Sequence, residues 1–218
     1  MQSEKVDNYF KTRLVFDKGR TKVWNAINEY LQYFLPDNAA VMDVGCGYGD
    51  FINGINAEKK YAIDLNEGMR EFISDKSVVF TAQSVLDEFP VADESLDAVF
   101  ASNLFEHFDD NELNDLIGNV RSKLKDKGRL ILIQPNIYYA YREYWDDYTH
   151  KKAFSHTSLA DFLVGHNFKI VHQKNRFLPF SLKSRLPKSY WLTKLYLMSP
   201  IKPMGKQMLI IAEKNGDE

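Results

Sequence analysis

One stretch constrains the fold more than any other: residues 41–50 read VMDVGCGYGD, a short apolar run that leads directly into closely spaced glycines. The apolar run is typical of a strand covered on both faces. The glycines allow backbone conformations that residues with a β-carbon avoid, and they let a ligand approach the backbone closely. They are Gly45, Gly47 and Gly49. Apolar residues at helical spacing follow at 51–55, so the pattern predicts a strand, a glycine turn and a helix capped by Asp50.

Two acidic residues indicate what kind of ligand this turn binds. Asp43 lies at the mouth of the turn, where a carboxylate repels phosphate but favours an ammonium or sulfonium group. The spacing G-x-G-x-G also differs from the G-x-G-x-x-G of nicotinamide and flavin sites. Asp64 ends the next predicted strand, residues 60–64, about 20 residues after the glycines, where Rossmann-type folds place an acid on ribose. Each acid alone could be a solvated strand-end residue, but together they favour a nucleoside with a positively charged attachment, such as S-adenosylmethionine.

At these residues the chain resembles the class I S-adenosylmethionine-dependent methyltransferase family. Residues 41–49 resemble the first motif of that family and residues 62–66 the second. The resemblance continues in the family's order through residues 89–99, 103–107 and 128–132. It implies an α/β fold with a Rossmann-like, seven-stranded, mostly parallel sheet and helices on both faces. It also implies a last strand that runs antiparallel between the fifth and the sixth.

The chain alternates predicted strands and helices, as a parallel sheet covered by helices requires. Its 218 residues suffice for one buried core and are few for two, so we expect a single domain at 1–218. Strands are predicted at 39–44, 60–64, 78–81, 96–101, 130–133, 168–171 and 207–212, and helices at 23–35, 67–74, 113–124 and 154–167. Within the domain we distinguish an N-terminal helical segment (1–38), an acceptor-side loop (134–156) and a basic aromatic insertion (178–206). The predicted helix at 154–167 has Thr157 or Ser158 as its cap.

The cofactor is expected at the carboxyl ends of the strands, as S-adenosylmethionine before the reaction and S-adenosylhomocysteine after it. The residues expected to bind it are Asp43, Gly45, Cys46, Gly47, Gly49, Asp64, Leu65, Ser84, Val85 and Asn103. Family members commonly carry an acid against the adenine amino group where this chain has Ser84. A hydroxyl can also accept that hydrogen bond. Cys46, the single cysteine, is expected to fill a tight space, because nothing near it in sequence supplies a base.

The acceptor-side loop is too aromatic for a solvated loop, so it forms either the acceptor side of the cleft or a lid with a small core of its own. Aromatic faces suit sugar rings, and Tyr138 and Tyr148 are the expected contacts. Arg142 is available for an anionic group. His150 is the first candidate for removing a hydroxyl proton and His107 the second, although His107 could equally pack or cap.

No metal ion is expected. Asp146, Asp147 and His150 have a D-D-x-x-H spacing without a strong geometric precedent. Methyl transfer itself needs no metal, because a sulfonium is already a good leaving group.

Charge is distributed unevenly along the chain. Residues 162–212 contain nine Lys and Arg residues and no acid, although the whole chain has a net charge of −2. Bulky apolar residues lie among these cations at 178–204, a combination that favours an anionic membrane or a lipid-linked acceptor over nucleic acid. The alternative is a lid whose lysines are solvated. From Trp145 onward the chain also resembles, more loosely, methyltransferases of surface-glycan and polysaccharide pathways.

The predicted function is O-methylation of a small-molecule glycan, a lipid-linked sugar or a similar metabolite. Competing hypotheses are a non-catalytic S-adenosylmethionine-binding module, a nicotinamide-dependent oxidoreductase, and a methyltransferase that reaches nucleic acid through the basic segment. The single cysteine suits a reducing compartment, residues 1–10 lack a signal-peptide pattern, and no apolar run reaches bilayer length. We therefore expect a cytoplasmic protein, with peripheral membrane contact through the basic segment.

Overall fold

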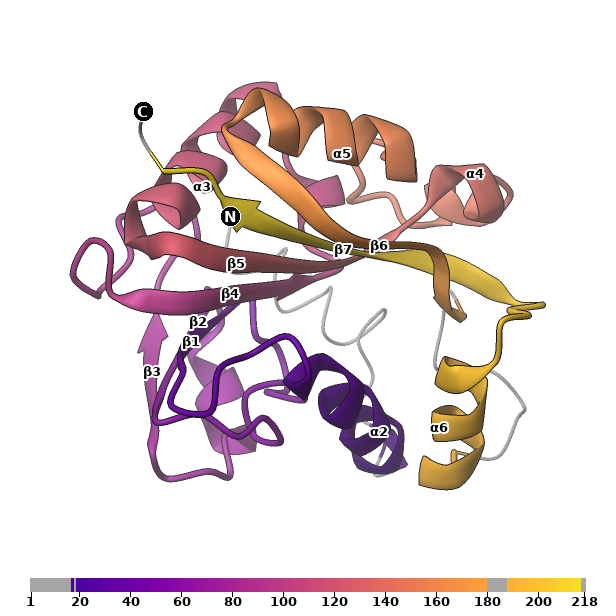
Figure 1. The fold of residues 1–218 in the computed structure, drawn as a ribbon, viewed down its shortest axis with the longest axis horizontal. Coiled ribbons are helices and arrows are strands. Elements are labelled where there is room, and N and C mark those ends of the chain that lie inside the picture. Colours follow the sequence, from indigo (N-terminus) through magenta and orange to yellow (C-terminus); the bar gives the residue numbers. More distant parts are fainter. Residues whose placement is uncertain (1–16, 18, 180–187, 217–218) are drawn as a thin grey trace.

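The computed structural model describes residues 17, 19–179 and 188–216, which form one sheet flanked by helices (Figure 1). The strands are β1 (Ala40–Val44), β2 (Lys59–Asp64), β3 (Val78–Ala82), β4 (Leu96–Ser102), β5 (Leu124–Pro135), β6 (Phe168–Pro179) and β7 (Gly205–Lys214). They are arranged in the order β3-β2-β1-β4-β5-β7-β6. Strands β1 to β5 pair in parallel, whereas β7 is antiparallel to both β5 and β6. The predicted seven-stranded Rossmann-like sheet is therefore confirmed.

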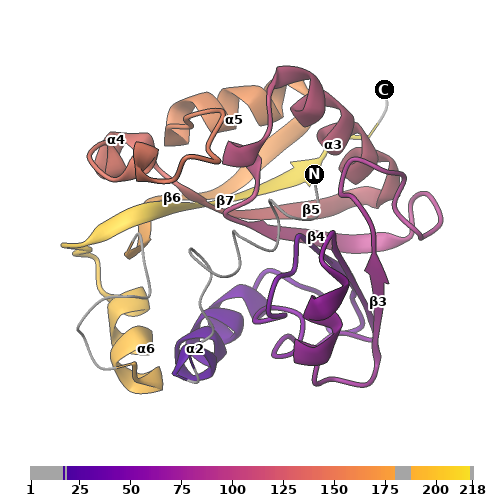
Figure 2. The same ribbon diagram turned by 180° about the vertical axis from the view of Figure 1, so that it is seen from behind.

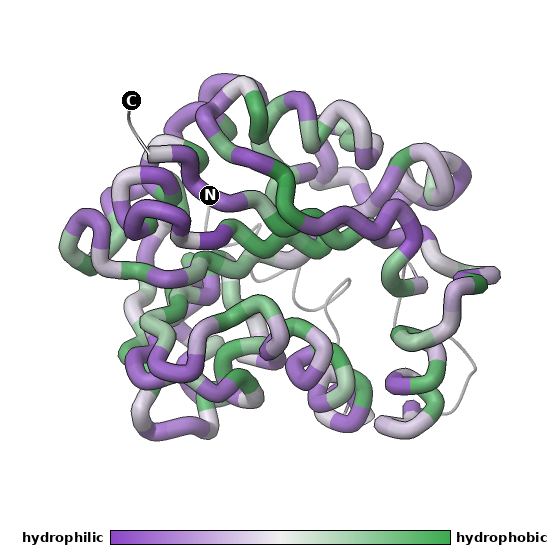
Figure 3. The backbone as a smooth tube through the Cα atoms, viewed as in Figure 1, coloured by the Kyte–Doolittle hydropathy of each residue, from purple (hydrophilic) through white to green (hydrophobic). Residues whose placement is uncertain are grey.

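Helices cover both faces of this sheet. The α-helices are α2 (Arg20–Gln32), α3 (Asp110–Lys123), α4 (Ile137–Ala140), α5 (His156–Gly165) and α6 (Tyr190–Met198), and the 3₁₀ helices are η1 (Glu67–Phe72), η2 (Phe105–His107) and η3 (Tyr144–Asp146). Helices α2 and α6 pack together on one face, and α3 and α5 lie on the other (Figures 1 and 2). The hydrophobic residues concentrate in the central strands between these two layers (Figure 3).

Side chains of β1 alternate between the two layers, because successive residues of a strand point to opposite faces. Val41 belongs to the core beneath α2, whereas Met42 and Val44 belong to the core beneath α3. Trp24 of α2 packs edge-on against Phe100 of β4, with ring centroids 6.2 Å apart. The helix before the first strand thus packs on the sheet.

The prediction of a helix after the glycine turn is wrong, because residues 50–54 form consecutive turns. In a helix the carbonyl oxygen of Asp50 would accept a hydrogen bond from Gly54. Here it accepts from Nδ2 of Asn28 at 2.9 Å, and the Gly54 N–H donates to Phe51 instead. The Asp50 carboxylate accepts from Nε of Arg20 at 2.9 Å.

Other boundaries also differ from the prediction: β5, for example, begins at Leu124 and includes the residues expected to turn before it. The segment predicted as a helix at 67–74 is the shorter 3₁₀ helix η1. The cap of α5 is Ser155, whose Oγ accepts from the N–H of Ser158 at 3.0 Å, so neither Thr157 nor Ser158 is the cap. Strand β6 extends to Pro179, so the basic aromatic insertion begins inside this strand and contains α6. None of the helices in the described part of the chain is long and apolar enough to cross a membrane.

Candidate functional site

The glycine turn after β1 requires glycine at all three positions. Gly45, Gly47 and Gly49 have φ angles of 70°, 49° and 67°, in the left-handed region that disfavours side chains. A β-carbon on Gly45 would lie 2.9 Å from Cδ1 of Leu104, and one on Gly49 would lie 2.6 Å from Cδ1 of Ile73. The turn is therefore held in one conformation by both its backbone and its neighbours.

Asp64 connects this turn to the end of β2. One carboxylate oxygen accepts from the N–H of Gly47 at 2.8 Å, and the other accepts from the N–H of Asn66 at 2.9 Å. Burial raises the pKa of this carboxyl, and the two hydrogen bonds oppose that shift. Each oxygen retains a second lone pair, so the carboxylate could also accept the two hydroxyls of a ribose.

Burial shifts the titration of two other groups in the turn. Asp43 is 2 % exposed, and burial together with the nearby carboxylates of Asp50 and Asp64 raises its pKa well above the usual range. Burial also raises the pKa of the Cys46 thiol, which keeps it protonated and supports a packing role. A cationic ligand such as a sulfonium would favour the ionised form of these acids, whereas a pyrophosphate would be repelled by that form.

The remaining expected cofactor residues lie at the same edge of the sheet. Leu65 is exposed directly after β2, and Val85 is buried after β3. The Ser84 hydroxyl accepts a hydrogen bond from the N–H of Leu86 at 3.2 Å, so it stabilises the turn in which it lies. Asn103 follows β4 with a φ of 50°, and its side-chain oxygen accepts from Nε2 of Gln207 at 2.7 Å. This set of residues fits a nucleoside laid along the carboxyl ends of β1 to β4.

A cluster of titratable groups follows β4. Glu106 is 1 % exposed, and its Oε1 lies 4.0 Å from Nε2 of His150. The rings of His107 and His150 contact edge to face with centroids 5.0 Å apart. Burial raises the pKa of Glu106 to about 8, and burial with the neighbouring His150 lowers the pKa of His107 to about 4. The predicted candidates His107 and His150 thus lie together, with a buried acid that the prediction omitted.

The acceptor-side loop is attached to this cluster by its backbone. The N–H groups of Lys151 and Lys152 donate to the carbonyl oxygen of Glu106 at 2.8 and 3.1 Å. Tyr144 is fully buried, and its hydroxyl donates to the Lys152 carbonyl at 2.9 Å. This loop therefore has a small core of its own and is also fixed at the carboxyl edge of β4.

Its expected acceptor contacts point outward. Tyr138 and Tyr148 are 69 % and 68 % exposed, and Arg142 is exposed beside the ring of Tyr141. The loop therefore presents these side chains to solvent and does not enclose them.

Lysines of the basic aromatic insertion pair with acids from other parts of the chain. Lys188 pairs with Asp17, and Lys194 Nζ lies 2.7 Å from Oε1 of Glu29. Lys206 pairs in the same way with Glu143 of the acceptor-side loop, at 2.5 Å. The uneven charge along the sequence is thus partly neutralised in the fold. Lys183 and Arg185 lie outside the described residues.

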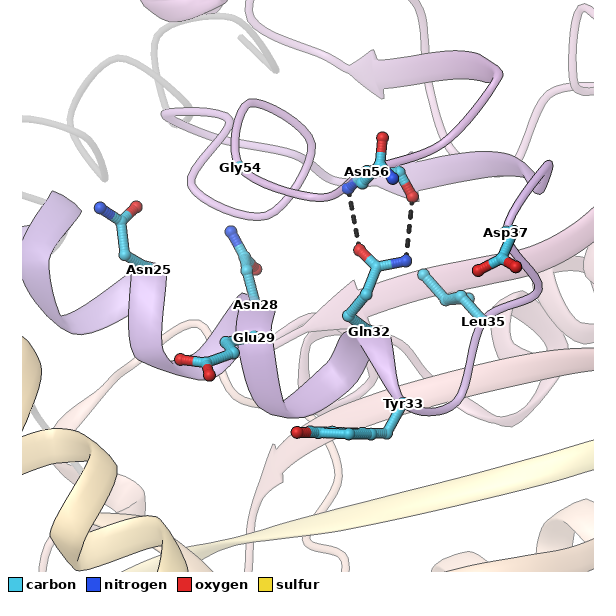
Figure 4. A pocket seen from close by; sticks show the side chains of 9 residues that line it. All are labelled: Asn25, Asn28, Glu29, Gln32, Tyr33, Leu35, Asp37, Gly54 and Asn56. Carbon is cyan, nitrogen blue, oxygen red and sulfur yellow. Dashed lines mark hydrogen bonds between the residues drawn. The ribbon is translucent and has the colours of Figure 1, made fainter.

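A pocket of about 570 Å³ lies at the opposite edge, between α2 and the segment that precedes β2 (Figure 4). Its lining residues are Asn25, Asn28, Glu29, Gln32, Tyr33, Leu35, Asp37, Gly54 and Asn56. Gln32 and Asn56 exchange two hydrogen bonds across it, of 2.9 and 3.0 Å. Since it contains none of the cofactor or acceptor residues, it is not part of the candidate site.

Comparison with known proteins agrees with this geometry. A family model described as a methyltransferase domain matches residues 17–173. A search of curated proteins finds no match.

Several solved structures share the fold. An S-adenosylmethionine-dependent methyltransferase from Archaeoglobus fulgidus is 22% identical with a TM-score of 0.64, over 88% of this chain and 94% of its own. One from Thermotoga maritima is 19% identical with a TM-score of 0.66, over 98% and 96% of the two chains. One from Mesorhizobium loti is 15% identical with a TM-score of 0.64, over 87% and 98%. The fold predicted from the sequence is confirmed, and the family match supports S-adenosylmethionine as the cofactor. This chain therefore belongs to the methyltransferase domain family.

Proposed function

We propose that this methyltransferase acts on a hydroxyl oxygen of a glycan, a lipid-linked sugar or a similar metabolite. The observation that carries the proposal is the acceptor-side loop, which displays exposed aromatic rings while its backbone is bonded to Glu106 at the end of β4. Aromatic faces bind the apolar faces of sugar rings, and their hydroxyl groups can bind sugar hydroxyls. The exposed rings are those of Tyr138, Tyr141, Trp145 and Tyr148.

Each cofactor residue has a distinct role in this proposal. S-adenosylmethionine, when bound, supplies a methyl group on a positively charged sulfur. The Asp64 carboxylate accepts the ribose hydroxyls, and the buried Asp43 stabilises the positive charge near the turn. Ser84 and Val85 contact the base. Asn103, held by Gln207, lies on the side of the acceptor.

His150 is the proposed base for the acceptor hydroxyl. The Glu106 carboxyl lies 4.0 Å from Nε2 of His150 and, when ionised, stabilises the imidazolium that forms when this histidine takes the proton. A positioned base contributes typically 10²- to 10⁴-fold. His107 is the second choice, because its low pKa makes it a weak base.

The same protein is proposed to contact an anionic membrane through α6. Apolar side chains at helical spacing are exposed along this helix and just beyond it. They are Trp191, Leu192, Leu195, Met198, Ile201 and Met204. Exposed apolar side chains of this kind suit the interior of a lipid surface, and contacts with phosphate groups do not require them. Lipid therefore ranks above nucleic acid as the partner of this segment.

The acceptor is tested with a methyl-labelled cofactor. The full chain is incubated with labelled S-adenosylmethionine and, separately, with membrane glycolipids, water-soluble glycans and RNA. Label is expected in a sugar-containing fraction. Tyr148→Ala should lower kcat/KM about 2- to 10-fold, the equivalent of about 0.5–1.5 kcal/mol for one aromatic contact. Tyr33→Ala, which removes another exposed ring near the opposite edge, should have no effect.

Three results would contradict the proposal. Label that enters RNA alone would favour the nucleic-acid reading. Cofactor binding without transfer to any fraction would favour the non-catalytic module. Equal effects of the Tyr148 and Tyr33 variants on kcat/KM would show that the acceptor-side loop does not recognise the acceptor.

A further inference from the structure

Three potential metal ligands converge at the carboxyl edge of β4. Glu106, His107 and His150 each offer one ligand atom, and these three atoms all lie within 4.8 Å of one another. Two of the residues come from η2, and the third comes from the acceptor-side loop, more than forty residues later. Two imidazoles and one carboxylate, with a further position left for water or substrate, form a donor set found in catalytic zinc sites.

The Glu106 carboxyl independently indicates a missing ligand. Its side chain is 1 % exposed, and no donor within the described residues reaches its Oε2 atom. A buried carboxylate oxygen without a hydrogen bond costs free energy, so native proteins rarely leave one in that state. A cation at this position would satisfy it.

Hydrogen bonds around Thr149 put His107 in the form that binds metal. The Thr149 hydroxyl donates to Oδ1 of Asp147 at 2.6 Å, so it accepts from Nδ1 of His107, which lies 3.0 Å away. The Thr149 carbonyl oxygen, 3.3 Å from the same nitrogen, is a second acceptor. The proton is therefore on Nδ1 and the lone pair on Nε2. Histidines that bind metals usually donate their other N–H to an oxygen in this way.

We propose that Glu106, His107 and His150 bind a divalent zinc ion. Zinc bonds of about 2.0–2.1 Å with tetrahedral angles place ligand atoms about 3.4 Å apart, so shifts of about 1 Å would close the cluster around the ion. The ion lies between the end of β4 and the acceptor-side loop. In the zinc-bound protein His150 is a ligand, and the ion replaces it as the group that promotes loss of the acceptor proton.

This last role rests on the proposed function, whereas zinc binding does not. An acceptor hydroxyl in the open position becomes more acidic, because zinc stabilises the oxyanion. Its proton leaves to solvent, a bond forms between the oxygen and the methyl carbon, and the bond from that carbon to sulfur breaks. No other reactant is consumed.

Zinc binding is tested on the full chain after treatment with a chelator and dialysis. Titration calorimetry with zinc chloride should show one ion per chain, and elemental analysis after dialysis should recover it. Glu106→Gln, His107→Gln and His150→Gln should each weaken zinc binding at least 10-fold. The matched control is His166→Gln, because this histidine bonds Asn114 and the Phe162 carbonyl away from the cluster. Circular dichroism verifies that each variant is folded.

Cobalt substitution provides a second readout that does not depend on activity. Co²⁺ in place of zinc should give a visible absorption band typical of a four-coordinate site, and this band should be absent in Glu106→Gln. The inference is overturned by less than one bound ion per chain, or by folded cluster variants that bind zinc as His166→Gln does. S-adenosylhomocysteine titration and methyl transfer are measured on the same samples. Methyl transfer without zinc binding would refute the zinc site alone, and zinc binding without any sugar methylation would refute the proposed acceptor alone.

Discussion

Replacing Asp64 with Asn should weaken cofactor binding while leaving the fold in place. The substitution keeps the shape of the side chain but removes its charge and turns one acceptor into a donor. That donor would face the N–H of either Gly47 or Asn66, each of which now bonds a carboxylate oxygen at 2.8 or 2.9 Å. A lost hydrogen bond to a charged group or a stranded buried partner costs about 1–3 kcal/mol. Affinity for S-adenosylhomocysteine should fall about 5- to 150-fold.

Titration calorimetry measures this affinity, and a second acid provides a matched control. Asp97 accepts from the N–H of Ala40 at 2.8 Å and pairs with Lys125 at 2.8 Å, at the opposite edge of the sheet. Asp97→Asn should therefore lower the free energy of unfolding without changing the affinity for S-adenosylhomocysteine. Wild-type affinity in Asp64→Asn would refute the assigned ribose contact. An equal loss in both variants would attribute the effect to stability.

Other predictions concern the glycine turn, the proposed base, a partly buried ion pair and the exposed apolar residues of α6. Gly49→Ala should destabilise the fold by at least about 1–2 kcal/mol in denaturant titration, because its φ is 67° and the new carbon meets Ile73; unchanged stability would contradict the turn geometry. His150→Ala should lower the rate of methyl transfer about 10²- to 10⁴-fold with cofactor affinity unchanged. Full turnover by this variant would exclude His150 as the base. The hydrogen bond from Lys60 lowers the pKa of Asp75 to about 2 from 3.8, so this pair stabilises the fold above pH 3.8 and its contribution is lost as the pH falls toward 2. Asp75→Asn should flatten that part of the acid-unfolding curve. An unaltered curve would contradict the stabilising role of this ion pair. Exchanging the exposed apolar residues of α6 for Ser should abolish co-sedimentation with anionic vesicles, whereas the same exchange at an exposed valine of β3 should not; equal sedimentation of both would refute membrane contact.

Much of the fold follows from local pattern. The apolar run of β1 predicts its burial on both faces, and all five of its residues are buried. The helical stripe at 113–124 predicts α3. These features could be read from the sequence because periodicity and glycine depend only on neighbours along the chain.

The cofactor edge was likewise predictable, since the carboxyl ends of parallel strands meet at one edge. The acceptor site was less predictable from the sequence. Glu106 was missed as a member of the site, although it directly precedes His107 in sequence. Its importance comes from burial and from the approach of His150, neither of which a local pattern reveals.

The sequence by itself thus determined the alternation of strands and helices, the glycine turn and the acids at the strand ends, because short-range sterics and hydrophobic periodicity decide them. Only the tertiary structure decided features that depend on residues far apart in the chain. Nδ2 of Asn28 donates a hydrogen bond to the carbonyl oxygen of Asp50 and prevents a helix there. Lys194 pairs with Glu29, which lies 165 residues away in the sequence. Likewise, Glu106 and His150 form one site because the acceptor-side loop folds back onto η2. Such contacts arise from packing of the whole chain, so no window of sequence contains them.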